Sequence, residues 1–278
     1  MKRTIIFIAV FSIGSLIGFF LNAFVTLLTP YKVNLAKSSP KESPTILNSP
    51  ETTVIKASPD PIRMNTIKSA VIVVDMQNAF ASKGGMIDKL GLFSDRNREI
   101  IEPIQKLLKV ARTAGIKIIY LRMVYRSDQS NAGGIESPNF WKETGIVAMR
   151  EKPEFKGKFI TEGTWDSEII DELKPLPGDI VVTKSRYSGF VNTELQTILQ
   201  TYNIKYLIFV GLATNVCVES TIRDAFFHEY FPILVSDCVA PVGPDYLQDA
   251  TIFNVKNFFG WVTTSEDLIK SILETGKK

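Results

Sequence analysis

A long apolar stretch opens the chain. Residues 4–31 contain no charged side chain, and residues 5–28 are mostly Ile, Phe, Leu, Val and Ala. About 20 such residues cross a bilayer as a helix, so residues 1–31 are predicted to form an N-terminal transmembrane anchor. A cleaved signal peptide is the alternative, although its apolar region is shorter and needs a small-residue cleavage site. We therefore expect a single-pass membrane protein, and basic residues on both flanks leave its orientation open.

Residues 32–62 differ sharply from this stretch. They contain five prolines among many Ser, Thr and Lys residues, with little apolar content. Such a composition cannot build a core and predicts a semi-extended linker. Residues 63–278 then form one domain, because that length is ample for a single hydrophobic core.

Within the domain, apolar runs alternate with amphipathic stretches, as in βαβ units around a parallel sheet. Residues 70–74 and 116–121 are predicted strands, and residues 97–114 place Ile, Leu and Ala on one face of a helix that Gly115 ends. A long polar loop is predicted over 122–164. Further strands are predicted at 179–183, 206–210, 232–235 and 259–262, and helices at 167–173, 193–202, 215–229, 246–257 and 264–274. The fold class is therefore α/β, a three-layer α/β/α sandwich with a mostly parallel sheet of about six strands.

Composition and charge exclude several kinds of site. A single histidine excludes multi-histidine zinc centres, and two cysteines cannot form a disulfide scaffold. The net charge of +3 arises entirely within residues 1–61, so the domain is neutral and bulk charge gives no reason to expect nucleic-acid binding.

Three ionisable residues follow predicted strands, where open α/β sheets bind their ligands. Asp75 and Lys184 each end an apolar run, and Cys217 lies between a predicted strand and a helix. Each residue alone has an ordinary structural explanation. An aspartate at the end of a strand is often a turn residue, a lysine there is usually solvated, and an isolated cysteine is often a small core residue. A cysteine at a helix N-terminus favours the thiolate, but it still needs a base. His228 lies eleven residues further along the same predicted helix, about 16 Å away, so Asp75 is the candidate base with Lys184 beside it.

Around these residues the sequence becomes recognisable. The segments VIVVDMQNAF, VVTKSRYSGF and GLATNVCVEST resemble the isochorismatase-like cysteine hydrolases, and within them most of all the ureidoacrylate amidohydrolases of pyrimidine degradation. The similarity covers residues 65–272. It implies that Asp75, Lys184 and Cys217 are catalytic and that the peptide bond between Leu212 and Ala213 is cis. The amides of Ala213 and Cys217 would then form an oxyanion hole.

The resemblance also implies a reaction and a set of substrate-binding residues. Cys217 would attack a ureido or amide carbonyl, and Asp75 would move the proton to the leaving nitrogen. The residues expected to line the substrate are Gln77, Phe80, Met123, Tyr125, Asn131 and Tyr187. Met123, Tyr125 and Asn131 stand where the ureidoacrylate enzymes carry more polar or acidic residues. We therefore expect a substrate with a less polar group beside the scissile carbonyl, and slower turnover of ureidoacrylate.

No cofactor is expected. Nicotinamidases in this superfamily hold a metal through histidines in the loop after the second strand, and residues 122–150 contain none. Cys238 follows a predicted strand and is either a spectator or a disulfide partner of Cys217 in an oxidising compartment. Arg186 is predicted to pair with a substrate carboxylate or with a structural acid.

Four functions remain open. The first is a membrane-tethered cysteine amidohydrolase acting on a small ureido compound, and the second is an amidase for another amide such as biuret or nicotinamide. The third is a non-catalytic binding protein, which would be expected to have lost the catalytic residues, whereas Asp75, Lys184 and Cys217 are all present. The fourth is vinyl-ether hydrolysis of isochorismate, a reaction that does not use the cysteine, so the presence of Cys217 argues against it. The expected partners are a small-molecule substrate, the membrane and further copies of the chain in a homo-oligomer, and no nucleic acid.

Overall fold

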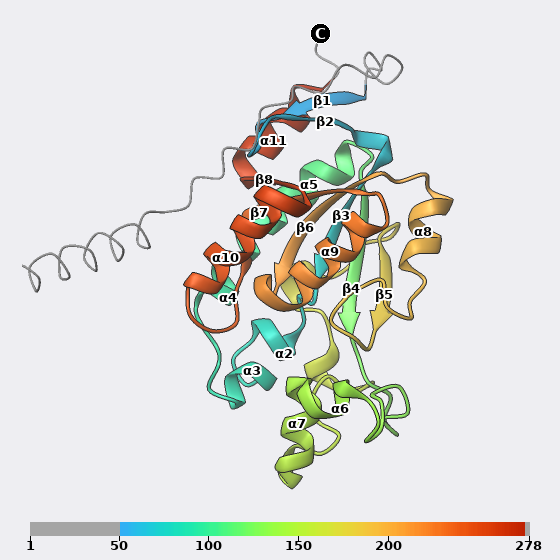
Figure 1. The fold of residues 1–278 in the computed structure, drawn as a ribbon, viewed down its shortest axis with the longest axis vertical. Coiled ribbons are helices and arrows are strands. Elements are labelled where there is room, and N and C mark those ends of the chain that lie inside the picture. The colour runs from blue at the N-terminus through green and yellow to red at the C-terminus, as the bar shows by residue number, and fades with distance from the viewer. Residues whose placement is uncertain (1–50, 276–278) are drawn as a thin grey trace, which may run out of the picture. The chain divides into compact units, whose positions relative to one another are not determined.

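A parallel sheet forms the centre of the domain (Figure 1). The computed structural model describes residues 51–275. In this part of the chain, six strands pair in the order β5-β4-β3-β6-β7-β8, all of them parallel. The strands are β3 (Ser69–Val74), β4 (Lys117–Met123), β5 (Ile180–Lys184), β6 (Tyr206–Leu212), β7 (Phe231–Ala240) and β8 (Trp261–Thr263). This confirms the predicted mostly parallel sheet of about six strands.

Helices cover both faces of this sheet (Figure 1). One face packs on α5 (Ile101–Thr113) and α11 (Ser265–Leu273), and the other on α8 (Leu195–Thr201), α9 (Glu219–Phe227) and α10 (Tyr246–Asn254), which continues into a π-helical turn, η6 (Val255–Phe259). Successive β3 residues alternate between the two cores, because strand side chains point to opposite faces. The three-layer α/β/α sandwich is therefore confirmed.

Local sequence explains where two of these helices lie. In α5, Ile104, Leu107, Leu108 and Ala111 recur at helical spacing and are all buried. Gly115 follows with φ of +75°, the left-handed conformation that commonly ends a helix. Helix α11 begins as predicted, because the Thr264 hydroxyl accepts a hydrogen bond from the amide of Asp267 at 3.2 Å.

The domain starts earlier than the sequence suggested. Strands β1 (Thr52–Ile55) and β2 (Ile62–Asn65) form an antiparallel hairpin, and the Thr53 hydroxyl donates to the Ser271 carbonyl of α11 at 2.6 Å. Ile55, Ile62 and Met64 are buried in the core under α5. The linker predicted over 32–62 is therefore wrong for residues 52–62. The misleading signal was a pair of prolines, which lie between the two strands and not within them.

The segment predicted as a polar loop over 122–164 contains three short helices. They are α6 (Pro138–Lys142), α7 (Thr144–Glu151) and a 3₁₀ turn, η2 (Pro153–Phe155). With α2 (Asn78–Ala81) and α3 (Met86–Lys89), this segment buries a small core of its own. We call these four helices the cap, which lies beyond the carboxyl ends of β3 and β4 (Figure 1).

Smaller corrections concern single turns. The helix predicted over 167–173 is replaced by two 3₁₀ turns, η3 (Trp165–Ser167) and η4 (Asp171–Leu173), because the amide of Ile170 bonds to the carbonyl of Met76 and holds the chain extended between them. The remaining one-turn helices are η1 (Thr66–Lys68) and α4 (Arg96–Glu99).

The predicted transmembrane anchor over residues 1–31 lies outside the described residues, as does the linker over 32–50. In residues 51–275, no helix is both long enough and apolar enough to cross a membrane.

Candidate active site

The carboxyl ends of β3, β5 and β6 bring the three predicted catalytic residues together. Chain connections leave β3 and β6 in opposite directions, and ligands bind at such a switch point. Asp75 follows β3 with φ of +48°, and Lys184 ends β5. The Lys184 Nζ and Asp75 Oδ2 atoms lie 2.7 Å apart, and both side chains are at most 1% exposed. The structure thus contains a fully buried ion pair where the sequence predicted one.

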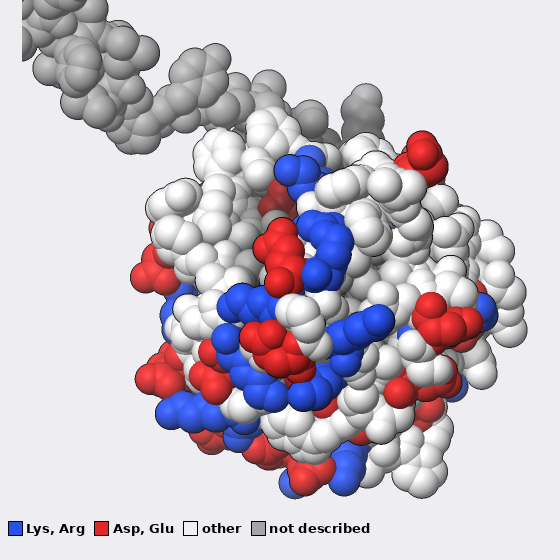
Figure 2. All heavy atoms as spheres, turned by 90° about the horizontal axis from the view of Figure 1, so that it is seen from below, with Lys and Arg blue, Asp and Glu red and all other residues white. Residues whose placement is uncertain are grey.

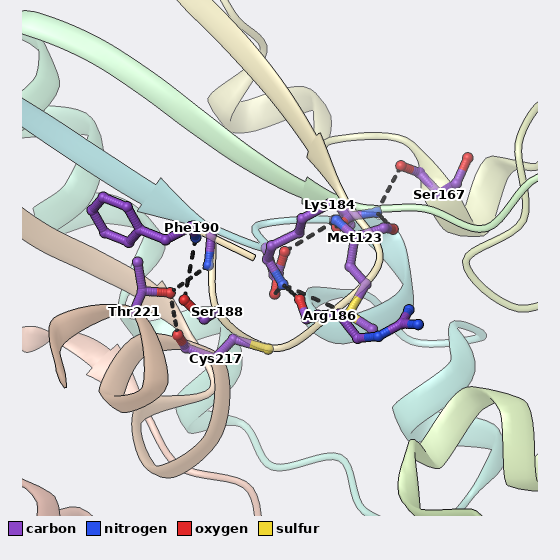
Figure 3. A network of polar contacts seen from close by, with 11 residues as sticks. Met123, Ser167, Lys184, Arg186, Ser188, Phe190, Cys217 and Thr221 are labelled. Carbon is purple, nitrogen blue, oxygen red and sulfur yellow. Dashed lines mark hydrogen bonds and ion pairs between the residues drawn. The ribbon is translucent and has the colours of Figure 1, made fainter. Parts of the chain in front are cut away.

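Cys217 lies beside this pair, and its side chain points toward Lys184 and Met123 (Figure 3). It belongs to a π-helical turn, η5 (Thr214–Val218), that leads from β6 into α9. The peptide bond between Leu212 and Ala213 is cis, as expected. The Thr221 hydroxyl donates to the Cys217 carbonyl at 2.6 Å and accepts from the amide of Gly189 at 3.0 Å. These bonds fasten the Cys217 turn to the loop that follows Lys184.

Burial and the close approach of the three groups together set their pKa values. It raises the pKa of the Cys217 thiol, an effect that the Lys184 charge only partly offsets. Burial likewise raises the pKa of Asp75 against the lowering effect of Lys184. For Lys184, burial alone would lower the pKa, but the interactions of its ammonium group with Asp75 and Cys217 raise it above the usual value. Burial therefore shifts the pKa of Cys217 in the direction opposite to the one expected from its place at a helix N-terminus.

A narrow pocket of about 80 Å³ opens onto Cys217. Three of the predicted substrate-binding residues, Phe80, Met123 and Tyr187, line it together with Asp75, Leu212 and Ala213. Met123 also lies against the catalytic lysine, with its sulfur 3.6 Å from the Lys184 Nζ atom.

The other three predicted substrate-binding residues do not line this pocket. Gln77 is fully buried and holds the backbone together: its amide nitrogen donates to the carbonyls of Met123 and Ser167 at 2.9 and 2.8 Å. Tyr125 is fully buried in the core of the cap. Asn131 bonds to the backbone of its own loop and lines a separate cavity. Each departs from the prediction because its polar atoms are used by protein partners.

One acidic residue of the pocket, Glu143, was not predicted from the sequence. It lines the same pocket as Cys217 and is 2% exposed, and its carboxylate caps α7 by accepting the amides of Gly145 and Ile146 at 3.1 and 2.8 Å. A glutamate just before an apolar run is a helix-start signal, but it lay inside the segment predicted as a loop.

Cys238 and His228 lie away from this chemistry. Cys238 is a free thiol in the core between the sheet and α5, whereas Cys217 belongs to the core on the opposite face of the sheet. The alternative of a disulfide between them is therefore wrong. His228 follows α9 and packs on the ring of Phe190.

Arg186 is not in the Cys217 pocket. Its guanidinium donates to the carbonyls of Asn131 and Ser185 at 2.9 and 2.6 Å, and it lines the separate cavity around Asn131. In the described residues Arg186 pairs with no acidic side chain, so the predicted structural ion pair is wrong, whereas pairing with a substrate carboxylate stays a prediction.

Metal-ligating side chains do not gather in the described part of the chain. Residues 51–275 contain no group of three or more His, Cys, Asp or Glu side chains that could hold a metal ion. Independence from metals and cofactors stays a prediction.

Comparisons with known proteins agree with this geometry. The Isochorismatase domain family matches residues 69–267. The ureidoacrylate amidohydrolase RutB of Caulobacter segnis is 46% identical over 225 residues, which cover 81% of this chain and 94% of that protein. The RutB protein of Rhizobium rhizogenes is 45% identical over 222 residues, covering 80% and 90% of the two chains. Among solved structures, a cysteine hydrolase from Pseudomonas syringae is 34% identical, with a TM-score of 0.65, and covers 76% of this chain and 95% of that one.

These matches confirm the resemblance found in the sequence. The matched family spans well over half of the chain, and the relatives are aligned over nearly their full lengths. The chain therefore belongs to the isochorismatase family, and it is a hydrolase.

Proposed function

We propose that the protein is a cysteine amidohydrolase that cleaves a C–N bond of a small ureido or amide substrate, of which ureidoacrylate is the type. The observation that carries this proposal is the buried Asp75–Lys184 ion pair, 2.7 Å long, whose Asp75 lines the same pocket as Cys217. A thiol becomes a strong nucleophile when an adjacent base removes its proton. The names of the matched relatives, which are amidohydrolases, support the same reaction class.

The proposed reaction has two halves. Asp75 takes the proton of Cys217 as the sulfur attacks the carbonyl carbon, and Lys184 holds the charge of Asp75 in place. The C–N bond then breaks, and Asp75 returns the proton to the leaving nitrogen. Water attacks the resulting thioester, the S–C bond breaks, and the thiol is regenerated. A ureido substrate gives an S-carbamoyl cysteine, which is released as carbamate.

The developing oxyanion needs hydrogen-bond donors. We assign this role to the backbone N–H groups of Ala213 and Cys217, because both residues line the pocket beside the nucleophile. Backbone donors of this kind are held in place before the reaction begins, so they need no reorganisation as the charge forms.

Ammonium release from a panel of small compounds tests this function. We expect turnover of ureido acids or simple amides by the purified protein, with ureidoacrylate turned over more slowly than a ureido compound whose neighbouring group is less polar. Biuret and nicotinamide belong in the panel as the alternative amides. A protein that binds these compounds but releases no ammonium from any of them is a binding protein on the same fold.

We further propose that residues 4–31 anchor the protein in a membrane, because about 20 uncharged, mainly apolar residues suffice to span a bilayer. The full chain should stay in the membrane fraction through high-salt and alkaline washes and be released by detergent. Mature protein beginning near Phe24 would show instead that the segment is a cleaved signal peptide. Assembly into a homo-oligomer also stays a prediction.

A further inference from the structure

We propose that the separate cavity around Asn131 binds a small anion with several charged oxygen atoms, such as a phosphate ester or a di- or tricarboxylate. The site goes beyond the proposed function, whose reaction makes no use of this cavity. The inference follows from the basic lining of the cavity, from arginine N–H groups that have no acceptor, and from a wall that divides the cavity from the Cys217 pocket.

The cavity has the size and the lining of an oxyanion site. Its volume is about 560 Å³, and it lies where β4 and β5 end. Arginines line it, and Glu162 is the acidic residue of its lining. A planar guanidinium matches two oxygens of a carboxylate or a phosphate group with parallel hydrogen bonds, so several around one cavity favour an oxyanion. The three arginines are Arg122, Arg126 and Arg186, and uncharged polar side chains beside them are those of Ser130, Thr183, Ser185 and Asn192.

Two of these arginines form no ion pair with any described residue. The Nη1 atom of Arg186 donates to two backbone carbonyls, at 2.9 and 2.6 Å, and its Nε and Nη2 atoms donate to no described residue. Arg126 is exposed and donates to the Ser130 hydroxyl at 3.3 Å. Asp128 interacts electrostatically with Arg126 but does not line the cavity. The charges of both arginines are therefore available to a ligand.

Arg122 adds a buried donor without an acceptor. Its Nη1 atom lies 3.7 Å from the carboxylate of Glu168, a side chain that is 56% exposed. Its Nε atom is buried and has no hydrogen-bond partner among the described residues. A buried donor left unpaired costs free energy, and a hydrogen bond to a ligand oxygen removes that cost. Arg122 therefore favours an occupant that carries acceptors.

A wall formed by the ends of β4 and β5 separates the cavity from the Cys217 pocket. Met123 and Tyr187 line the pocket. The residues next to them in the chain, Val124 and Arg186, line the cavity instead. In Figure 3 the guanidinium of Arg186 points away from the Cys217 sulfur. An anion in the cavity is therefore bound apart from the reacting atoms.

The surface at this end of the molecule carries charges of both signs. Seen from below, basic side chains gather near the middle of the face, with acidic ones among them (Figure 2). Because the two signs are interspersed, the face has no broad positive field that would collect anions of every kind. Anion binding is therefore decided by the lining of the cavity.

Calorimetric titration of the full chain in detergent tests the site, with pyrophosphate, citrate and acetate as the probes. We expect saturable binding of pyrophosphate and citrate, and binding of acetate that is at least about tenfold weaker, because a single carboxylate reaches fewer of the arginines. Sodium chloride should weaken the binding, since salt screens partly exposed charges. Absence of saturable binding of both multivalent anions, or equal binding of acetate, would overturn the proposal.

Charge variants assign the binding to the cavity. We expect Arg126→Gln and Arg186→Gln each to weaken pyrophosphate binding about tenfold. Arg63→Gln is the matched control: Arg63 is an exposed arginine of β2 that does not line the cavity, and its replacement changes the net charge equally. Unchanged affinity in Arg126→Gln, or an equal loss in Arg63→Gln, would refute the assignment. Because the Arg126 side chain is exposed, its variant decides the matter even where Arg186→Gln fails to fold.

Thermal unfolding gives a second measurement. A ligand that binds the folded state raises the Tm, so pyrophosphate should stabilise the unmodified protein and Arg63→Gln more than Arg126→Gln. Equal stabilisation of all three proteins would count against the cavity. Neither measurement needs turnover, so failure of the proposed hydrolase function and failure of the anion site are detected separately.

Discussion

Alanine in place of Cys217 will stop the hydrolysis of every ureido or amide substrate, with a loss of about 10⁴-fold or more, because the proposed reaction passes through a covalent intermediate on the Cys217 sulfur. The fold should survive, since the thiol is small and makes no disulfide. Ammonium release measures the loss. Mass spectrometry of unmodified protein quenched during turnover should find the acyl or carbamoyl mass on the Cys217 peptide.

The other cysteine supplies the control. Cys238 is equally buried but lies in the core on the opposite face of the sheet, so Cys238→Ala should retain turnover. Asp75→Asn should prevent formation of any adduct, because the thiol then has no base. That change leaves Lys184 buried without its counter-ion, so folding is checked by circular dichroism. Retained activity in Cys217→Ala, or an adduct on Cys238, would contradict the mechanism.

Alanine at Gly211 will cause a large loss of stability. Gly211 ends the pairing of β6 with β3 at a φ of +109°, and an added Cβ atom would lie 2.1 Å from the carbonyl oxygen of Val74. That oxygen belongs to the backbone of the central strand, which cannot move aside without breaking the sheet. We expect the free energy of unfolding to fall by about 4 kcal/mol or more, measured by urea denaturation. Substrate turnover should fall as well, because the residues that follow Gly211 lead into the turn that holds Cys217.

Alanine at Gly178 separates the cost of a positive φ from the cost of the steric contact with Val74. It has a similar φ of +98°, but an added Cβ atom there would have no neighbour within 4 Å. Gly178→Ala should therefore cost only the conformational penalty of about 1–2 kcal/mol. Equal losses in the two variants would show that the backbone conformation, and not the contact with Val74, requires glycine at position 211.

The site residues that lie at the ends of strands could be predicted from the sequence. Asp75, Lys184 and Cys217 each follow an apolar run, and parallel strands place all their carboxyl ends at one edge of a sheet. Gln77 was misjudged as a substrate ligand, because the sequence does not show that the backbone of Met123 and Ser167 would use its amide. Glu143 was missed, because its polar surroundings were taken for a loop.

The sequence by itself determined the fold class, the catalytic candidates and the family, because these depend on periodicity and on motifs that are local in the chain. Only the tertiary structure decided which side chains face the pocket. The cap buries its core by bringing together segments far apart in sequence, such as those that carry Met86, Ile146 and Phe159. The charge of the pocket follows from that packing, since it brings Glu143 to the nucleophile and leaves Arg186 in another cavity. Burial then raises the pKa of the Cys217 thiol, against the direction that its place beside a helix suggested.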